Sequence, residues 1–184
     1  MSQERDTYGI DIAGVHRELE LFTIKPGLRI AILNILGDTE LVDACAKALA
    51  KKLAKIDYQA LVTAEAKSIP LAHMLSIETG KPYVILRKSY KPYMGDAIQS
   101  ETLSITTGKP QTLYLDEKDR KLIEGANVII LDDVISTGST LQSMRMILEK
   151  AGAKVVAEAA ILTEGERAKW ADIIALGHLP IFSD

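Results

Sequence analysis

Apolar positions recur in two periods along the chain, and short apolar runs alternate with amphipathic stretches. Leu41, Val42, Cys45 and Leu49 recur at helical spacing opposite a lysine-rich side, which predicts a helix over residues 39–55. The same reasoning gives the remaining elements of an alternating order. We expect further helices over residues 70–78 and 140–151 and near Trp170, and strands over residues 60–64, 83–86, 128–131, 154–162 and 173–176.

Two parts of the chain depart from this alternation. Residues 1–27 mix charged and apolar positions and close on Lys-Pro-Gly, so we expect an N-terminal arm that is partly helical. Residues 101–105 and 111–115 alternate apolar and polar side chains around Thr-Gly-Lys-Pro, which predicts a β-hairpin. Strands that alternate with helices indicate an α/β fold. We expect one domain over residues 1–184, with a doubly wound, mainly parallel sheet and flanking helices.

Composition narrows the class of protein. The 184 residues are 47% hydrophobic and 26% charged, as in an ordinary globular domain. A net charge of −3 argues against a nucleic-acid surface. No apolar run approaches the about 20 residues that span a bilayer, and the first residues lack a signal-peptide core, so we expect no membrane partner and a cytoplasmic location. Cys45, the single cysteine, lies on an apolar helix face and is expected to be a core thiol.

One segment carries the chemistry. Residues 127–141 read NVIILDDVISTGSTL, an apolar strand followed by two adjacent carboxylates, Asp132 and Asp133, and a loop of small residues. Small side chains let backbone N–H groups approach an anion, and the N-terminus of the following helix adds partial positive charge. The loop expected to bind phosphate comprises Ser136, Thr137, Gly138, Ser139 and Thr140.

Two familiar phosphate motifs do not fit. A P-loop requires Gly-Lys-Ser or Gly-Lys-Thr, whereas Gly80-Lys81 and Gly108-Lys109 each precede proline. A dinucleotide fingerprint needs three spaced glycines, and the loop has one. An apolar strand ending in acids could imitate the metal-binding strand of an ATPase, but the P-loop is missing. A sugar phosphate fits instead, because carboxylates accept hydrogen bonds from sugar hydroxyls while the loop takes the phosphate.

Residues 128–140, VIILDDVISTGST, resemble the 5-phosphoribosyl 1-diphosphate (PRPP) motif of the type I phosphoribosyltransferases. The resemblance extends over residues 26–176 and best matches the adenine phosphoribosyltransferase-like purine enzymes. It implies the type I phosphoribosyltransferase fold, with a β-hairpin hood over residues 89–111. It also implies an enzyme of purine salvage that transfers the phosphoribosyl group of PRPP to a purine base, adenine being favoured, to give a nucleoside 5-monophosphate and pyrophosphate.

The resemblance also implies roles for particular residues. Asp132 and Asp133 would hold the ribose and are the candidate catalytic residues, together with Glu101 in the hood. Val134 or Ile135 would form an apolar floor for the base. Mg²⁺ would bind through PRPP near the two aspartates, and the protein would be a homodimer. The residues expected to contact pyrophosphate are Glu65, Ala66, Lys67, Ser68, Arg87, Lys88 and Lys91.

The chain departs from the family pattern at three places. Lys67 and Ser68 replace the usual arginine and glycine, which keeps the charge but loses bidentate geometry. Two threonines precede Gly108, where adenine-specific members carry glutamate and tyrosine. The family's Phe-Arg-Asp is missing after Pro26-Gly27. A xanthine, hypoxanthine or orotate acceptor therefore stays open, as does a non-catalytic PRPP-sensing regulator. Purine regulators carry an added N-terminal DNA-binding domain, and only about 25 residues precede the core here, which argues against that reading.

Overall fold

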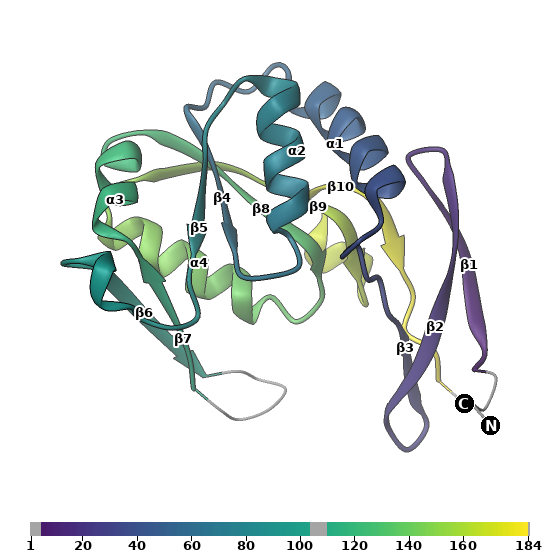
Figure 1. Ribbon diagram of the computed structural model, residues 1–184. Coiled ribbons are helices and arrows are strands. Elements are labelled where there is room, and N and C mark those ends of the chain that lie inside the picture. Colours follow the sequence, from purple (N-terminus) through teal and green to yellow (C-terminus); the bar gives the residue numbers. More distant parts are fainter. Residues whose placement is uncertain (1–4, 104–109, 184) are drawn as a thin grey trace.

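A computed structural model describes residues 5–103 and 110–183, and a five-stranded sheet of order β10-β9-β8-β4-β5 forms its centre (Figure 1). Every neighbouring pair of these strands is parallel. The chain reverses its direction across the sheet between β4 and β8, and ligands bind at such a switch point. The doubly wound parallel sheet is therefore confirmed. The strands are β4 (Ala60–Ala64), β5 (Tyr83–Leu86), β8 (Asn127–Ile135), β9 (Lys154–Glu164) and β10 (Ile174–Leu179).

Helices cover both faces of this sheet. Side chains alternate along β8, so that Ile129 and Leu131 pack in one cluster with α1 and α2, whereas Val128 and Ile130 pack in another with α4. Burial on both faces explains the continuous apolar run of this strand. The helices are α1 (Thr39–Leu53), α2 (Ile69–Thr79), α3 (Glu117–Ile123) and α4 (Ser139–Lys150), of which α3 was not predicted.

The helix termini follow local sequence signals. Asp38 caps α1, and its side chain accepts a hydrogen bond from Leu41 N at 3.1 Å. Gly80 closes α2 in the left-handed conformation that glycine adopts without steric cost. The predicted start of the first helix at residue 39 and the predicted end of the second at residue 78 agree with these termini to within one residue.

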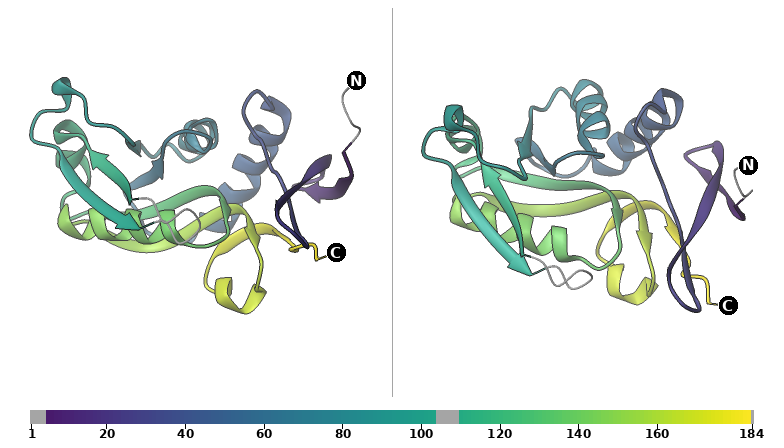
Figure 2. Two further views of the ribbon diagram at one scale, coloured as in Figure 1. Left: turned by 90° about the horizontal axis from the view of Figure 1, so that it is seen from below. Right: turned by 60° about the horizontal axis from the view of Figure 1, so that its bottom comes forward.

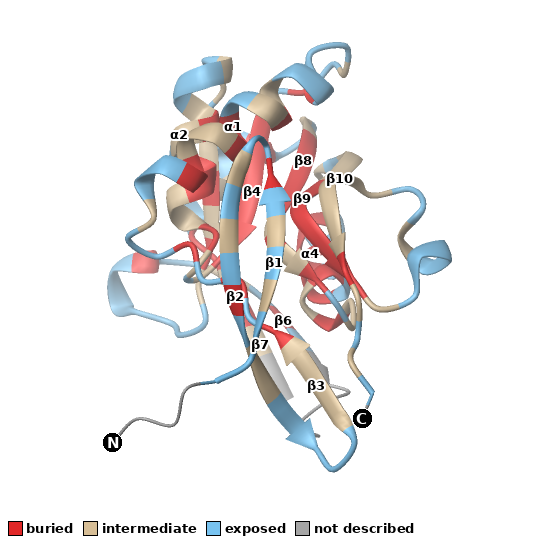
Figure 3. Cartoon of the chain, turned by 90° about the vertical axis from the view of Figure 1, so that its right-hand side faces the viewer, coloured by how far each residue is buried: buried red, intermediate tan, exposed pale blue. Residues whose placement is uncertain are grey.

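The N-terminal arm is a β-structure, and the expectation of a partly helical arm was wrong. Strands β1 (Thr7–Ile12), β2 (Val15–Lys25) and β3 (Leu28–Ala31) form an antiparallel sheet. Exposed and more buried side chains alternate along β1 and the first half of β2 (Figure 3). The two turn residues Ala13 and Gly14 have φ of 51° and 83°, the positive pair that a tight hairpin requires.

A second hairpin lies at the opposite end of the molecule from β1–β3 (Figure 2). It consists of β6 (Ile98–Leu103) and β7 (Pro110–Leu115), which pair in antiparallel register and confirm the predicted hairpin. The first strand, β6, begins at Ile98 and not at residue 101 as predicted. The expected turn around Gly108 lies outside the described residues. A 3₁₀ turn, η1 (Pro92–Met94), precedes the hairpin.

Two boundaries near the expected site differ from the prediction. β8 does not end at Leu131 but continues to Ile135, because Asp132 still pairs in register with Ala160 of β9. The two aspartates therefore belong to the strand. The helix expected near Trp170 is a short 3₁₀ turn, η2 (Arg167–Trp170). Within residues 5–103 and 110–183, no helix combines the length and apolar character needed to cross a bilayer.

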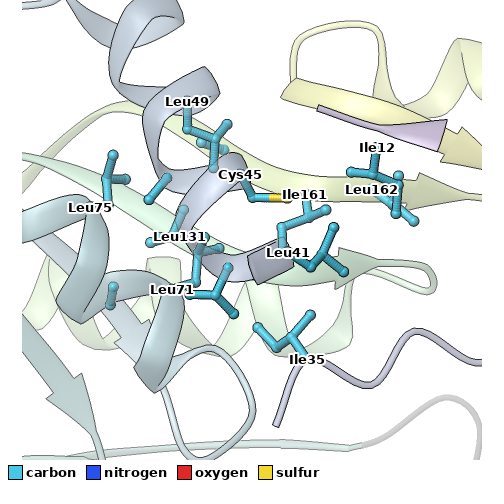
Figure 4. Packing of buried hydrophobic residues seen from close by; sticks show 14 of the residues in the cluster. Ile12, Ile35, Leu41, Cys45, Leu49, Leu71, Leu75, Leu131, Ile161 and Leu162 are labelled. Carbon is cyan, nitrogen blue, oxygen red and sulfur yellow. The ribbon is translucent and has the colours of Figure 1, made fainter. Parts of the chain in front are cut away.

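The predicted core thiol is confirmed. Cys45 is 0% exposed and lies on α1 among the apolar side chains of the larger cluster, where it faces Ile161 (Figure 4). Burial raises the pKa of this thiol to about 12. A thiol reacts as its thiolate, so Cys45 is chemically inert in the folded chain.

We predict that native protein does not react with dithionitrobenzoate near neutral pH on the timescale of minutes, because Cys45 is both inaccessible and protonated. Released thionitrobenzoate, followed by absorbance, measures the reaction. The same sample in denaturant should release one equivalent, since the sequence contains one cysteine. Rapid stoichiometric reaction of the native protein would contradict this packing.

Candidate active site

The two aspartates at the end of β8 meet the loop that follows β4, across the switch point of the sheet. Ser68 Oγ joins them: it donates to Asp132 Oδ1 at 2.8 Å, accepts from Asp133 N at 2.9 Å and lies 3.2 Å from Asp133 Oδ1. Ser68 is buried. A serine at this position thus binds the loop to both acids, which a glycine could not do.

Lys67 supplies the charge that the two acids need. Its Nζ lies 2.8 Å from Asp133 Oδ2 and donates to Leu33 O at 3.0 Å. Asp133 is 6% exposed. Burial, and then the charge of Asp133, raise the pKa of Asp132 to about 7. Hydrogen bonds donated by Ser68 and Lys67 therefore stabilise the charged form of the pair.

Glu65 anchors the same loop to the next strand. Its carboxylate accepts hydrogen bonds from Arg87 Nε and, at 2.8 Å, from Lys88 N. Arg87 is thereby engaged in orienting Glu65, whereas Lys88 faces the cavity at the switch point. The sequence analysis expected both Arg87 and Lys88 to contact pyrophosphate. In the structure only Lys88 lines the cavity, whereas Arg87 binds Glu65.

The loop after β8 has the form of an anion site. Gly138 begins α4 with φ of 83°, and a Cβ at this position would lie 2.8 Å from the Trp170 ring. The Thr137 and Ser139 hydroxyl oxygens are 3.0 Å apart, and Lys169 Nζ donates to Thr137 O at 3.1 Å. The first turn of α4 carries no acidic side chain, so its free N–H groups can receive an anion.

The loop after β4, the two aspartates and the ends of the loop after β8 line one cavity of about 290 Å³, whereas Thr137, Gly138 and Ser139 do not line it. Ile135 does not line it, because its side chain is 2% exposed in the cluster beneath α4. Lys91 and Glu101 are exposed outside the lining, and Glu101 lies on β6. The predicted site residues that line the cavity are Glu65, Ala66, Lys67, Ser68, Lys88, Asp132, Asp133, Val134, Ser136 and Thr140.

A second cavity, of about 820 Å³, adjoins the first, and sequence reasoning missed both of its central residues. Glu164 ends β9 and lines both cavities, and burial raises its pKa. Trp170 contacts Gly138 in the loop after β8 and also lines the second cavity. The position of Glu164 at the carboxyl end of a strand next to β8 was the signal that could have found it.

The acids fit a metal that arrives with its ligand. No cluster of three or more His, Cys, Asp or Glu side chains suited to a metal occurs in the described part of the chain. Asp132 and Asp133 remain as an adjacent pair of carboxylates. Mg²⁺ commonly binds through one or two carboxylates together with substrate phosphates, so this pair suits it better than it suits a metal held by protein alone.

Comparison with known proteins agrees with this geometry. Residues 32–176 match the phosphoribosyl transferase domain family, so the chain belongs to that family. The adenine phosphoribosyltransferase of Thermoanaerobacter pseudethanolicus has a similar fold, with a TM-score of 0.71 and 22% identity over 87% of this chain and 95% of that one.

Curated relatives carry two kinds of name. A hypoxanthine/guanine phosphoribosyltransferase of Methanosalsum zhilinae is 38% identical over 61% of this chain and 55% of its own length. The purine biosynthesis transcriptional repressor PurR of Bacillus subtilis is 30% identical over 78% of this chain and 49% of its own length. The chain thus spans about half the length of these relatives.

We predict that Gly138→Ala destabilises the fold more than Gly37→Ala does. Both glycines have positive φ, but an added Cβ meets Trp170 only at Gly138 and nothing within 4 Å at Gly37. The shared backbone penalty is about 1 kcal/mol, and the contact with Trp170 adds roughly 1–3 kcal/mol. Urea unfolding followed by circular dichroism measures both variants. Equal losses would show that the loop is not packed against Trp170.

Proposed function

We propose that this protein transfers the 5-phosphoribosyl group of PRPP to a purine base, releasing pyrophosphate and a nucleoside 5-monophosphate. The observation that carries the proposal is the cavity at the switch point, which has paired carboxylates between a basic loop and an anion-binding loop. The basic loop, the carboxylates and the anion-binding loop follow one another along the cavity in the order of the diphosphate, ribose and 5-phosphate of PRPP. Membership of the phosphoribosyl transferase domain family supports the same assignment.

PRPP would lie with its three parts on three segments of the chain. The 5-phosphate would bind the loop from Ser136 to Thr140 at the N-terminus of α4. The ribose hydroxyls would donate to Asp132 and Asp133, which would otherwise repel the phosphates. The diphosphate would lie near residues 65–68 and Lys88.

The reaction displaces pyrophosphate at C1 of the ribose by a ring nitrogen of the purine. Lys67, Lys88 and the backbone of residues 65–68 would stabilise the charge that develops on the departing diphosphate. Mg²⁺, bound with PRPP near the two aspartates, would neutralise part of the same charge. Closure of the hood over residues 89–111 would exclude water from the reacting carbon.

Binding of PRPP would change the partner of Lys67. In this structure its ammonium lies against Asp133 Oδ2, an oxygen that the ribose hydroxyls would also need. Lys67 is partly exposed and flexible enough to turn from the acid to the diphosphate. The lysine at this place of the family pattern would thus serve both states of the site.

The acceptor is proposed at the level of a purine. The sequence resemblance favours adenine, and the named relatives point to adenine for the solved structure and to hypoxanthine and guanine for the curated enzyme. Purine is the class common to them. A homodimer remains a prediction of the same resemblance, and a single domain over residues 1–184 remains a prediction from the chain length.

A second candidate is a regulator that binds PRPP without turning it over. The similarity to a purine repressor over 143 residues favours it, as do the lysine and serine at positions 67 and 68. Catalysis and binding alone make different predictions for pyrophosphate release.

We expect pyrophosphate release from PRPP and Mg²⁺ with at least one base among adenine, guanine, hypoxanthine and xanthine, and none with orotate. A coupled assay of pyrophosphate with each base, and without any base, measures this. No release with any base, combined with PRPP binding by calorimetry, would replace the enzyme by the regulator. Release with orotate alone would overturn the purine assignment.

We expect Asp133→Asn to weaken PRPP binding about tenfold or more, because a carboxylate accepts charge-assisted hydrogen bonds from the ribose that an amide replaces poorly. Isothermal titration calorimetry with PRPP and Mg²⁺ measures the change. Asp172→Asn is the matched control, since Asp172 is exposed and lies outside the lining of the cavity. Unchanged binding in Asp133→Asn, with circular dichroism showing a folded protein, would remove the ribose from this position.

A further inference from the structure

Glu164 is a buried carboxylate whose charge the fold does not use. Its side chain is 9% exposed and lines both cavities. Across residues 5–103 and 110–183 it has no side-chain hydrogen bond or ion pair, although its backbone oxygen accepts one from Trp170. A mostly buried carboxyl group that lines a cavity and makes no hydrogen bond with the described residues is available to a ligand there, so its position indicates a role toward the ligand.

The surrounding backbone holds Glu164 in place. Glu164 O accepts from Trp170 Nε1 at 2.9 Å. His178 Nε2 donates to Gly165 O at 3.0 Å, and its Nδ1 lies 2.9 Å from Thr163 Oγ1. The residues before and after Glu164 are thus tied to β10 and its own backbone to η2. These contacts fix the main chain from which the Glu164 side chain extends, so the reach of its carboxyl group is limited to the two cavities that it lines.

The two cavities meet at Glu164. Ile30, Ser136 and Glu164 are the residues that line both of them. With the 5-phosphate on the loop at Ser136 and the ribose on the two aspartates, a base attached at C1 would extend toward this junction. Leu28, Ile30 and Trp170 give the second cavity apolar walls suited to a flat ring. Among the described residues that line it, Glu164 is the one buried charged side chain.

The chemistry of a carboxylate decides which purine edge fits. An ionised carboxylate only accepts hydrogen bonds and offers two oxygens side by side. Guanine presents N1–H and the 2-amino group as two parallel donors, and hypoxanthine presents N1–H alone. Adenine presents one amino donor beside the lone pair of N1, which a carboxylate repels. Such N–H donors would also offset the burial that raises the pKa of Glu164.

We propose that Glu164 is a specificity-determining residue that accepts hydrogen bonds from the N1–C2 edge of the acceptor purine and orders the ligands as guanine, then hypoxanthine, then adenine. The assignment rests on the proposed function for the place of the ribose and phosphate. It goes beyond that function because it selects a 6-oxopurine by a residue outside the PRPP motif. Bidentate pairing of this kind discriminates by about ten- to a hundredfold.

Calorimetric titration with GMP, IMP and AMP tests the proposal without requiring turnover. The wild-type protein should bind GMP about ten- to a hundredfold more tightly than AMP, with IMP between them. Glu164→Gln should reduce or reverse this ratio, because a glutamine amide can donate to N1 of adenine while its oxygen accepts from the 6-amino group. Glu78→Gln is the matched control, since Glu78 is an exposed glutamate on α2 outside the lining of both cavities, and it should preserve the wild-type ratio.

The outcomes separate this inference from the proposed function. AMP binding as tightly as GMP in the wild type, or a GMP/AMP ratio that Glu164→Gln leaves unchanged, would overturn the role of Glu164. A Glu164-dependent ratio without pyrophosphate release from PRPP would support the role of Glu164 and overturn only the enzyme. Thermal unfolding of the ligand-free Glu164→Gln variant, compared with that of the Glu78→Gln control, checks that the variant is folded.

Discussion

The site depends on one electrostatic constraint: two adjacent carboxylates must lie beside a loop built for an anion. The fold meets this constraint with a buried serine and a lysine. Ser68 Oγ connects Asp132 and Asp133, and Lys67 Nζ lies 2.8 Å from Asp133 Oδ2. Without these partners, two adjacent like charges, of which that of Asp133 is buried, would strongly destabilise the carboxyl end of β8. The loop after β4 is therefore needed for the stability of the site as well as for its ligand.

The parallel sheet gives the site two unlike halves. Asp132 and the residues after it pair in register with β9, so the half proposed for the ribose belongs to the hydrogen-bonded ladder of the central sheet. The half proposed for the diphosphate is a loop held by side chains, with Glu65 bound by Arg87 and Lys67 bound by Asp133. Side-chain contacts exchange more easily than ladder hydrogen bonds. Adjustment to ligand should thus occur mainly in the second half.

Sequence reasoning succeeded where a single element carried its own signal. The cap at Asp38, the glycine end of α2 and the apolar period of α1 depend on local preference and burial. The prediction for the arm before Pro26 was wrong, because a charged surface hairpin has no continuous apolar run. The signal for its turn was only Ala13-Gly14. Glu164 was missed since a carboxylate after an apolar strand reads as an ordinary strand end until neighbouring strands are known. The sequence predicted most of the residues that line the cavity at the switch point, whereas the adjacency of Glu164 and Trp170 to them depends on the fold.

The contact between Gly138 and Trp170, which are 32 positions apart in the sequence, connects the loop after β8 with the wall of the second cavity. The indole fills the space that a side chain at 138 would need, and its N–H holds the backbone of Glu164. A lineage that altered the segment around Trp170 would also disturb the loop at Gly138, which we propose binds the phosphate. New acceptors should therefore arise more readily through changes at the opposite wall, around Leu28 and Ile30, where the chain has already left its family's usual pattern.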